Sequence, residues 1–188
     1  FDSDLSRLDC RHTADEAERS LELSAGVEFQ SFNIDLRFGW SGQPFEYWAA
    51  NLERCVESET PHISIYRVDL PANPAKNEAD PEHKTANRRY EFALDFLRDA
   101  GYQPYEISHF ARPGHACRQL NAYWSHTNHI GFGPSAHSFW RSAGETARRW
   151  NNIENTARYI ELIRQRELPL QARETLPPDD LANEYIIL

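Results

Sequence analysis

The sequence has no methionine and only three cysteines among its 188 residues. A chain of this length usually carries a few methionines, so either the protein avoids them or methionine positions are missing from the sequence. Cys10, Cys55 and Cys117 are widely spaced, and no two of them have the close spacing of zinc or iron–sulfur ligands. We therefore expect three reduced thiols in a cytoplasmic protein.

Long apolar runs and an excess of positive charge are lacking too. No segment approaches the ~18 apolar residues of a membrane span, and no stretch has the pattern of a signal peptide. The sequence thus gives no indication of membrane association. The 20 Lys and Arg are outnumbered by 29 Asp and Glu, which gives a formal net charge of −9. Because nucleic-acid-binding proteins normally carry a basic surface, we expect no nucleic-acid partner.

Helices and strands alternate over residues 1–108, which we predict to be one domain. Periodicity and end signals predict helices at 12–25, 44–57 and 84–100, and strands at 31–38, 62–68 and 102–108. Such alternation favours βα units and a parallel sheet. A complete barrel needs more units than these, so the sheet is either small and open or part of a barrel. Residues 69–83 hold three prolines and many charges and are predicted to be a loop.

Residues 109–188 have a different character, and we predict a second, truncated subdomain there. The first part, 109–140, is rich in His, Gly and aromatic residues and shows little periodicity. Amphipathic patterns predict helices at 153–166 and 178–188, the second with Pro178 in its first turn. The fold class is therefore α/β, with a mixed subdomain at its C-terminal end.

Asp35 is the most suggestive single residue. It lies in the middle of a predicted strand between Ile34 and Leu36, on the face opposite the apolar side chains. If the sheet is covered on both faces, this carboxylate points into the interior and needs a partner or a ligand. If the second face is open to solvent, Asp35 is an ordinary surface residue. The local sequence leaves both alternatives open.

Glycine and histidine are concentrated in the second subdomain. The stretch G131-F-G-P-S-A-H-S138 can line a ligand with backbone amides, or it can be a tight structural turn. Five histidines form a loose cluster in the sequence: His109, His115, His126, His129 and His137. Their spacing argues against a metal site. They are either ordinary histidines with hydrogen-bonding partners, or one of them meets a haem or porphyrin.

Six blocks of the sequence together resemble one family. The blocks, in chain order, are FDSDLSRLDCRHTADEA, FNIDLRFGWSGQPFEYW, PHISIYRVD, GYQPYEISHFARPGHACRQLNAYW, GFGPSAHSF and RRWNN. They are similar to the C-terminal half of the HemN/HemW family of radical S-adenosylmethionine (SAM) proteins. This family contains the oxygen-independent coproporphyrinogen III oxidases and a branch of haem chaperones. The Y-E-I-S, N-A-Y-W and A-H-S strings resemble the chaperone branch more than the oxidases.

The resemblance implies a fold, cofactors and site residues. The fold is the C-terminal part of a partial (β/α)6 radical SAM barrel plus the start of a mixed C-terminal subdomain. The cofactors are SAM and a [4Fe–4S] cluster. Asp35 and Arg11 match family residues that contact SAM, and a carboxylate and a guanidinium suit its ammonium, ribose and carboxylate groups. The residues that the resemblance places toward haem or porphyrin are Tyr105, Glu106, Asn121, Tyr123, Trp124 and His137.

The sequence departs from the family pattern at two points. The cluster motif C-x-x-x-C-x-x-C is absent, so we assign no catalytic or metal-ligating residue in this chain. The chaperone motif H-N-x-x-Y-W is replaced by R118-Q-L-N-A-Y-W124, which leaves the haem ligand open, with His109 and His115 as the nearest substitutes.

Three functions remain in view at this point. The first is haem binding and transfer to apoproteins, with haem or porphyrin and the accepting apoproteins as partners. The second is oxidative decarboxylation of coproporphyrinogen propionates to vinyl groups. The third is an inert fragment of either protein.

Overall fold

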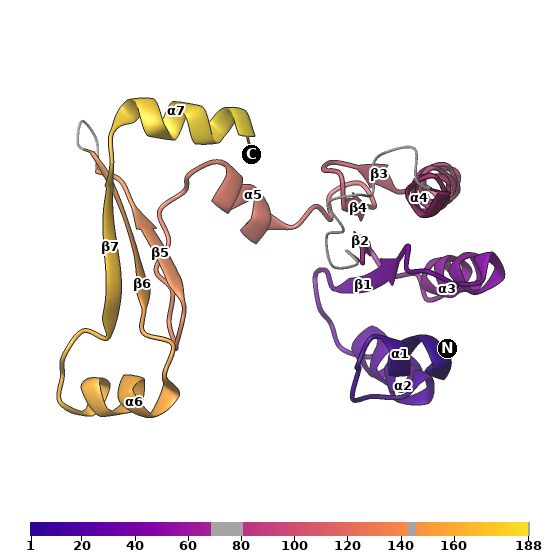
Figure 1. The fold of residues 1–188 in the computed structure, drawn as a ribbon, viewed down its shortest axis with the longest axis horizontal. Coiled ribbons are helices and arrows are strands. Elements are labelled where there is room, and N and C mark those ends of the chain that lie inside the picture. The colour runs from indigo at the N-terminus through magenta and orange to yellow at the C-terminus, as the bar shows by residue number, and fades with distance from the viewer. Residues whose placement is uncertain (69–80, 143–145, 188) are drawn as a thin grey trace. The chain divides into compact units, whose positions relative to one another are not determined.

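The computed structural model describes residues 1–68, 81–142 and 146–187, and it divides into two compact units, Phe1–Ala116 and Cys117–Leu188 (Figure 1). The loop predicted at 69–83 falls largely on residues 69–80, outside the described part. The first unit includes His109–Ala111, which the sequence analysis assigned to the second subdomain.

The first unit is a four-stranded sheet with helices. Its elements are α1 (Asp2–Arg7), α2 (Ala14–Ala25), β1 (Asn33–Phe38), α3 (Phe45–Glu57), β2 (His62–Arg67), α4 (Pro81–Asp99), β3 (Gln103–Pro104) and β4 (His109–Ala111). The strand order is β1-β2-β4-β3, with β1 and β2 parallel, as predicted. The strand predicted at 102–108 is correct only for β3: the chain folds back after Pro104, and β4 pairs antiparallel with both β2 and β3. Pro104 lies at the sheet edge, where a residue without an amide proton is tolerated.

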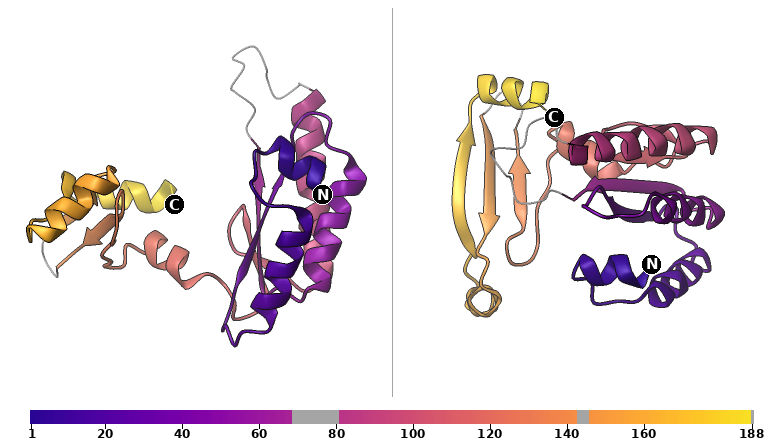
Figure 2. Two further views of the ribbon diagram at one scale, coloured as in Figure 1. Left: turned by 90° about the horizontal axis from the view of Figure 1, so that it is seen from below. Right: turned by 45° about the vertical axis from the view of Figure 1, so that its right-hand side comes forward.

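Alternation along β1 and β2 gives the sheet two different faces. Ile34, Leu36 and Phe38 point toward α3 and α4, where they meet the buried Ile63 and Ile65 of β2. Figure 2 shows α3 and α4 lying along this face. The other buried core residues are Trp48, Leu52, Cys55, Ala93, Leu97, Tyr102 and Phe110. Each fully buried Leu, Ile or Phe side chain contributes about 1.5–3 kcal/mol, so this layer holds the unit together.

The core also contains one of the three thiols. Cys55 is buried in it, and burial raises the pKa of its thiol to about 12. None of Cys10, Cys55 and Cys117, all of which are described residues, forms a disulfide. A thiol that stays protonated in an apolar core is a packing group rather than a nucleophile.

Local signals fix the helix ends where the sequence predicted them. Thr13 caps α2: its side chain accepts from the Glu16 amide while the Glu16 carboxylate accepts from the Thr13 amide. This reciprocal pair satisfies two amides that the first helical turn leaves without partners. Gly101 ends α4 with a φ of 88°, in the left-handed region that glycine adopts without strain.

The second unit is a three-stranded antiparallel sheet with helices at its ends. Its elements are α5 (Arg118–Trp124), β5 (His137–Trp140), β6 (Ala147–Asn152), α6 (Thr156–Arg164), β7 (Leu170–Leu176) and α7 (Pro178–Ile187). The strands lie in the order β5-β6-β7. Phe139, Ala147, Leu176 and Leu181 form a small core between the sheet and α7.

The glycine-rich stretch is a structural turn held by the protein itself. The amide of Gly131 donates to Ser138 Oγ at 3.0 Å, and that of Gly133 donates to the Tyr159 hydroxyl at 3.1 Å. The buried Asn152 side chain donates to the carbonyls of both glycines. Because both amides already donate within the protein, the stretch is the tight structural turn and not the alternative in which backbone amides line a ligand.

Gly131 has no room for a side chain, because a Cβ there would lie 2.3 Å from the carbonyl oxygen of His137. We expect Gly131→Ala to push the turn away from β5 and to lower the free energy of unfolding by about 1–3 kcal/mol. Urea denaturation of the whole protein measures the change. Gly26→Ala is the control, because Gly26 has a helical φ and its nearest contact is 3.5 Å. Equal stability of the two variants would contradict the account.

Candidate functional site

The sheet face opposite α3 and α4 carries a cluster of polar side chains, which we call the polar face. The parallel register pairs Asn33 with His62 and Asp35 with Ser64, and the antiparallel register pairs Ser64 with His109. Neighbouring residues on paired strands point to the same face. The polar face therefore brings together side chains from three strands that are distant in the sequence.

Asn33 is the centre of a hydrogen-bond network on the polar face. Its amide nitrogen donates to Asp35 Oδ1 at 2.6 Å, so its oxygen is the acceptor for the remaining partners. That oxygen accepts from His62 Nδ1 at 2.5 Å and from Ser64 Oγ at 3.0 Å. Two donors on one oxygen fix the orientation of the amide. Asn33 thereby holds the Asp35 carboxylate in one position.

The network extends to the turn between β3 and β4. His62 Nδ1 carries a proton, so the neutral ring accepts at Nε2, which lies 2.5 Å from the Tyr105 hydroxyl. The Ser64 hydroxyl, which donates to Asn33, accepts in turn from His109 Nδ1 at 3.0 Å. Glu106 Oε2 lies 3.6 Å from His109 Nε2. Tyr105 and Glu106, two predicted haem-facing residues, thus belong to the polar face around Asp35.

Asp35 is accessible on the polar face. The Asp35 side chain is exposed, and among the described residues only its Oδ1 atom accepts a hydrogen bond. A carboxylate with one open oxygen fits the ammonium or ribose hydroxyls of SAM. Arg11 is exposed in the turn between α1 and α2, and no hydrogen bond or ion pair within the described ranges joins it to Asp35. Asp35 therefore lies on the polar face, and Arg11 lies in the turn between α1 and α2.

No iron–sulfur site is formed by the described residues. No group of three or more His, Cys, Asp or Glu there has the geometry to hold a metal ion. Cys55 is in the core of the first unit, whereas Cys117 precedes α5 in the second unit. None of the three thiols belongs to a metal-binding group among the described residues.

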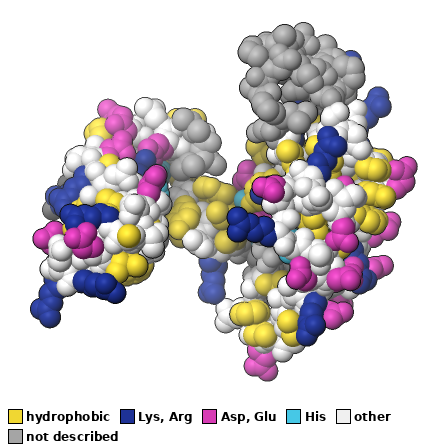
Figure 3. Space-filling model, turned by 60° about the horizontal axis from the view of Figure 1, so that its bottom comes forward, with side chains coloured by type: hydrophobic (Ala, Val, Ile, Leu, Met, Phe, Trp, Pro, Cys, Tyr) yellow, Lys and Arg dark blue, Asp and Glu magenta, His cyan; other side chains and the backbone are white. Residues whose placement is uncertain are grey.

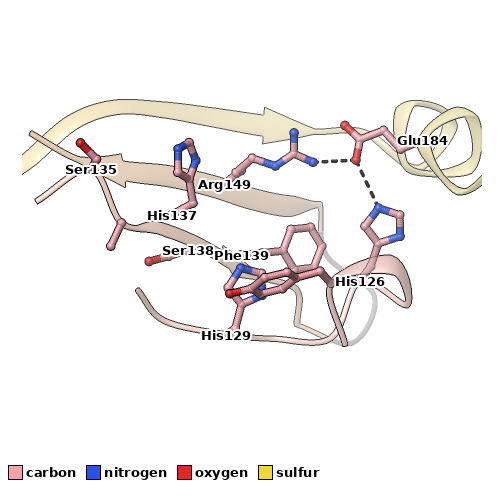
Figure 4. A pocket seen from close by; sticks show the side chains of 10 residues that line it. His126, His129, Ser135, His137, Ser138, Phe139, Arg149 and Glu184 are labelled. Carbon is pink, nitrogen blue, oxygen red and sulfur yellow. Dashed lines mark hydrogen bonds and ion pairs between the residues drawn. The ribbon is translucent and has the colours of Figure 1, made fainter. Parts of the chain in front are cut away.

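The second unit contains a pocket of about 720 Å³ lined by three histidines. Its lining residues are Tyr123, His126, His129, Ser135, Ala136, His137, Ser138, Phe139, Arg149 and Glu184 (Figure 4). The volume falls within the ~300–1,000 Å³ that is typical of small-molecule sites. Of the predicted haem-facing residues, Tyr123 and His137 line this pocket. Asn121 is exposed on α5, Trp124 is half-buried at its end, and neither is among the lining residues.

One side of the pocket is a chain of charged contacts. Glu184 Oε2 of α7 lies 2.6 Å from Arg149 Nη2 of β6 and 3.2 Å from His126 Nε2. The hydrogen bond from Arg149 lowers the pKa of the Glu184 carboxyl, against a smaller effect of burial. Figure 4 shows these three side chains linked together. The contacts tie α7 to the sheet and to the segment after α5.

Sequence reasoning missed most of both sites. Asn33, His62 and Ser64 were not predicted as site residues, although they alternate with apolar residues in their strands as Asp35 does. Arg149 and Glu184 gave no signal, because they meet only through the packing of α7 on β6. Of the five clustered histidines, His109 is on the polar face and three others line the pocket.

Charge and hydropathy of the described residues bear on which partners the chain can contact. On the face seen in Figure 3, acidic and basic side chains are interspersed. No helix in the described part of the chain is long and apolar enough to cross a membrane.

Comparisons with known proteins give the family context. No family model matches the sequence. The chain is 33% identical over 136 residues to the haem chaperone HemW of Escherichia coli, covering 71% of this chain and 36% of that protein. It is 29% identical over 191 residues to HemW of Mycobacterium tuberculosis, covering 98% and 48%. The chain resembles HemW.

A mammalian protein and a solved structure extend this HemW-like relationship. The mouse mitochondrial radical S-adenosyl methionine domain-containing protein 1 is 29% identical over 143 residues, covering 72% of this chain and 32% of that protein. The solved structure of E. coli HemN, described as a radical SAM coproporphyrinogen III oxidase, covers 100% of this chain and 46% of its own. Its TM-score is 0.74 at 22% identity, so it shows the fold. The HemW-like chain spans less than half the length of these proteins.

The buried position of His62 predicts a pH dependence. Burial lowers the pKa of His62 to about 4, with His109 adding to the decrease and Asp35 opposing it. In the unfolded chain His62 binds a proton at about pH 6.5. The unfolded state therefore takes up more protons between these values, so stability is full above pH 6.5 and falls as the pH drops toward 4. We expect the mismatch in the pKa of His62 between the two states to lower the free energy of unfolding by about 1–3 kcal/mol near pH 4.

Two measurements check this pH dependence. In NMR titration of the whole protein, the His62 ring should remain neutral at pH 5.5. The free energy of unfolding should fall less between pH 7 and pH 5 in His62→Gln than in wild type, because glutamine does not titrate. A His62 midpoint near 6.5 would refute the assignment.

Proposed function

We propose that the HemW-like chain belongs to a cytoplasmic radical SAM protein of haem metabolism that binds haem and delivers it to apoproteins. The observation that carries the proposal is the histidine-lined pocket of the second unit, in a chain whose curated relatives are named haem chaperones. The HemN likeness concerns the fold and gives no reason to prefer the oxidase.

The pocket suits haem chemically. Haem is a flat, largely apolar molecule whose iron takes imidazole ligands. Phe139, which is 3% exposed, and the ring of Tyr123 supply aromatic surface, while His126, His129 and His137 supply imidazole. Arg149 places a cation in the lining. This combination of a mostly apolar wall with a few polar groups is typical of a cofactor-sized site.

The polar face of the first unit supplies a second role in this proposal. Asp35, held by Asn33, would hold SAM through its ammonium or ribose hydroxyls, and Arg11 would approach the SAM carboxylate. The cluster that reduces SAM would be held by another part of the whole protein. Bound SAM supplies a source of the 5′-deoxyadenosyl radical; the residues of this chain bind and orient it. Tyr105 and His62 contribute by fixing the Asn33 amide.

Haem titration of the whole protein tests the proposed function. We expect a saturable Soret band with a position characteristic of ligated iron, because the pocket offers imidazole next to an apolar wall. Protoporphyrin IX without iron is the control and should bind more weakly. A featureless increase in absorbance that does not saturate with added haem would contradict the proposal. Conversion of coproporphyrinogen III by the reconstituted protein with SAM would favour the oxidase instead.

Asp35→Asn tests the SAM contact separately. Loss of the charge should weaken SAM binding about 10–100-fold, because hydrogen bonds to charged groups contribute about 1.5–3 kcal/mol. Calorimetric titration of the cluster-loaded whole protein measures the affinity. Asp15→Asn is the matched control, since Asp15 is an exposed carboxylate on α2 of the same unit. Unchanged SAM affinity in Asp35→Asn would remove Asp35 from the site.

A further inference from the structure

The three histidines of the pocket differ in what their ring nitrogens already contact. An iron ligand needs a ring nitrogen with a free lone pair, directed into the site and fixed by a second contact. Comparing the three therefore identifies which one is prepared to bind haem iron.

His129 has the required tautomer. Its Nδ1 atom lies 3.0 Å from the backbone carbonyl oxygen of Thr127. A carbonyl oxygen only accepts, so Nδ1 carries a proton, and in the neutral ring Nε2 carries the lone pair. Histidines that ligate metals characteristically donate their other N–H to a carbonyl or carboxylate, which orients the ring and raises its basicity.

His129 is also fixed in place by its backbone and its ring. Its amide donates to the Phe139 carbonyl at 2.9 Å and its carbonyl accepts from the Phe139 amide at 3.0 Å. Its ring stacks on Phe139, with centroids 6.1 Å apart and planes at 20°, and lies 4.6 Å from the Tyr123 ring. A ligand held this way loses little conformational freedom when it binds, which favours affinity.

His126 is engaged elsewhere. Its Nε2 atom lies 3.2 Å from Glu184, which also binds Arg149. Binding iron through this nitrogen would break the contact that connects His126 to α7. Figure 4 shows His126 turned toward Glu184, while His129 lies apart from this charged chain.

His137 lacks the orienting contact. It is exposed at the start of β5, and no hydrogen bond within the described ranges fixes which of its ring nitrogens is protonated. A ring without such a contact is free to turn into solvent. It lines the pocket but is not prepared as a ligand.

We infer that His129 Nε2 is the axial ligand to haem iron in this pocket, with Thr127 setting its tautomer. The inference rests on the proposed haem-binding function and adds the atom that binds. Ligation by the neutral ring is a bond from the Nε2 lone pair to iron, and it leaves the proton on Nδ1 in place.

The test is ferric haem titration of the whole protein as wild type, His129→Ala and His137→Ala. We expect His129→Ala to lose the histidine-ligated spectrum and to bind haem at least about tenfold more weakly. Added imidazole should restore the spectrum, because the variant leaves a space beside the iron. His137→Ala is the matched control from the same pocket and should keep the wild-type spectrum.

His129→Cys adds a test in which a new spectrum is gained, so that the result does not depend only on the loss of haem binding. A thiolate at the same position should replace the histidine spectrum with that of a thiolate-ligated iron. A wild-type spectrum in both position-129 variants would overturn the inference and leave the proposed function standing. Absence of saturable haem binding by the wild type would overturn both.

Discussion

The parallel register of β1 and β2 determines both faces of the first unit. Because side chains alternate along a strand, pairing Asn33 with His62 sends Ile34, Ile63, Leu36 and Ile65 toward α3 and α4. The same pairing collects the polar side chains on the other face. A slip of one residue would bury the polar set and expose the apolar one. The burial of the core therefore also specifies the geometry around Asp35.

The second unit depends on a different kind of constraint. Its sheet has a small core, and polar contacts carry much of its organisation. Asn152 holds the turn at Gly131 and Gly133 against β6, while Glu184 joins α7 to Arg149 and His126. The pocket lies among these contacts, so its shape depends on hydrogen bonds more than on apolar packing. This differs from the polar face, whose position is fixed by the core beneath the sheet.

The sequence predicted much of the first unit and little of the second, for physical reasons. Alternation in 31–38 and 62–68, and caps such as Thr13, are local signals that survive in the structure. The strands β6 and β7 lack such signals: β7 is exposed along most of its length, and β6 contains Arg148, Arg149 and two asparagines. The polarity of Asp35 was visible in the sequence, whereas its partner Asn33 is itself held by His62 and Ser64 of β2, which the sequence did not reveal. Likewise, the tautomer of His129 follows from a carbonyl whose position no sequence pattern reveals.

The Asn33 amide joins the parts of the polar face because its two ends differ: one end donates and the other accepts. Exchange of its nitrogen for oxygen, the change that deamidation produces, would remove the donor without altering the size of the side chain. Two carboxylates would then face each other at positions 33 and 35, and like charges at that distance repel. Deamidation of Asn33 would thus replace a hydrogen bond that positions Asp35 with repulsion between two carboxylates, while the hydrophobic core beneath the sheet stays unchanged.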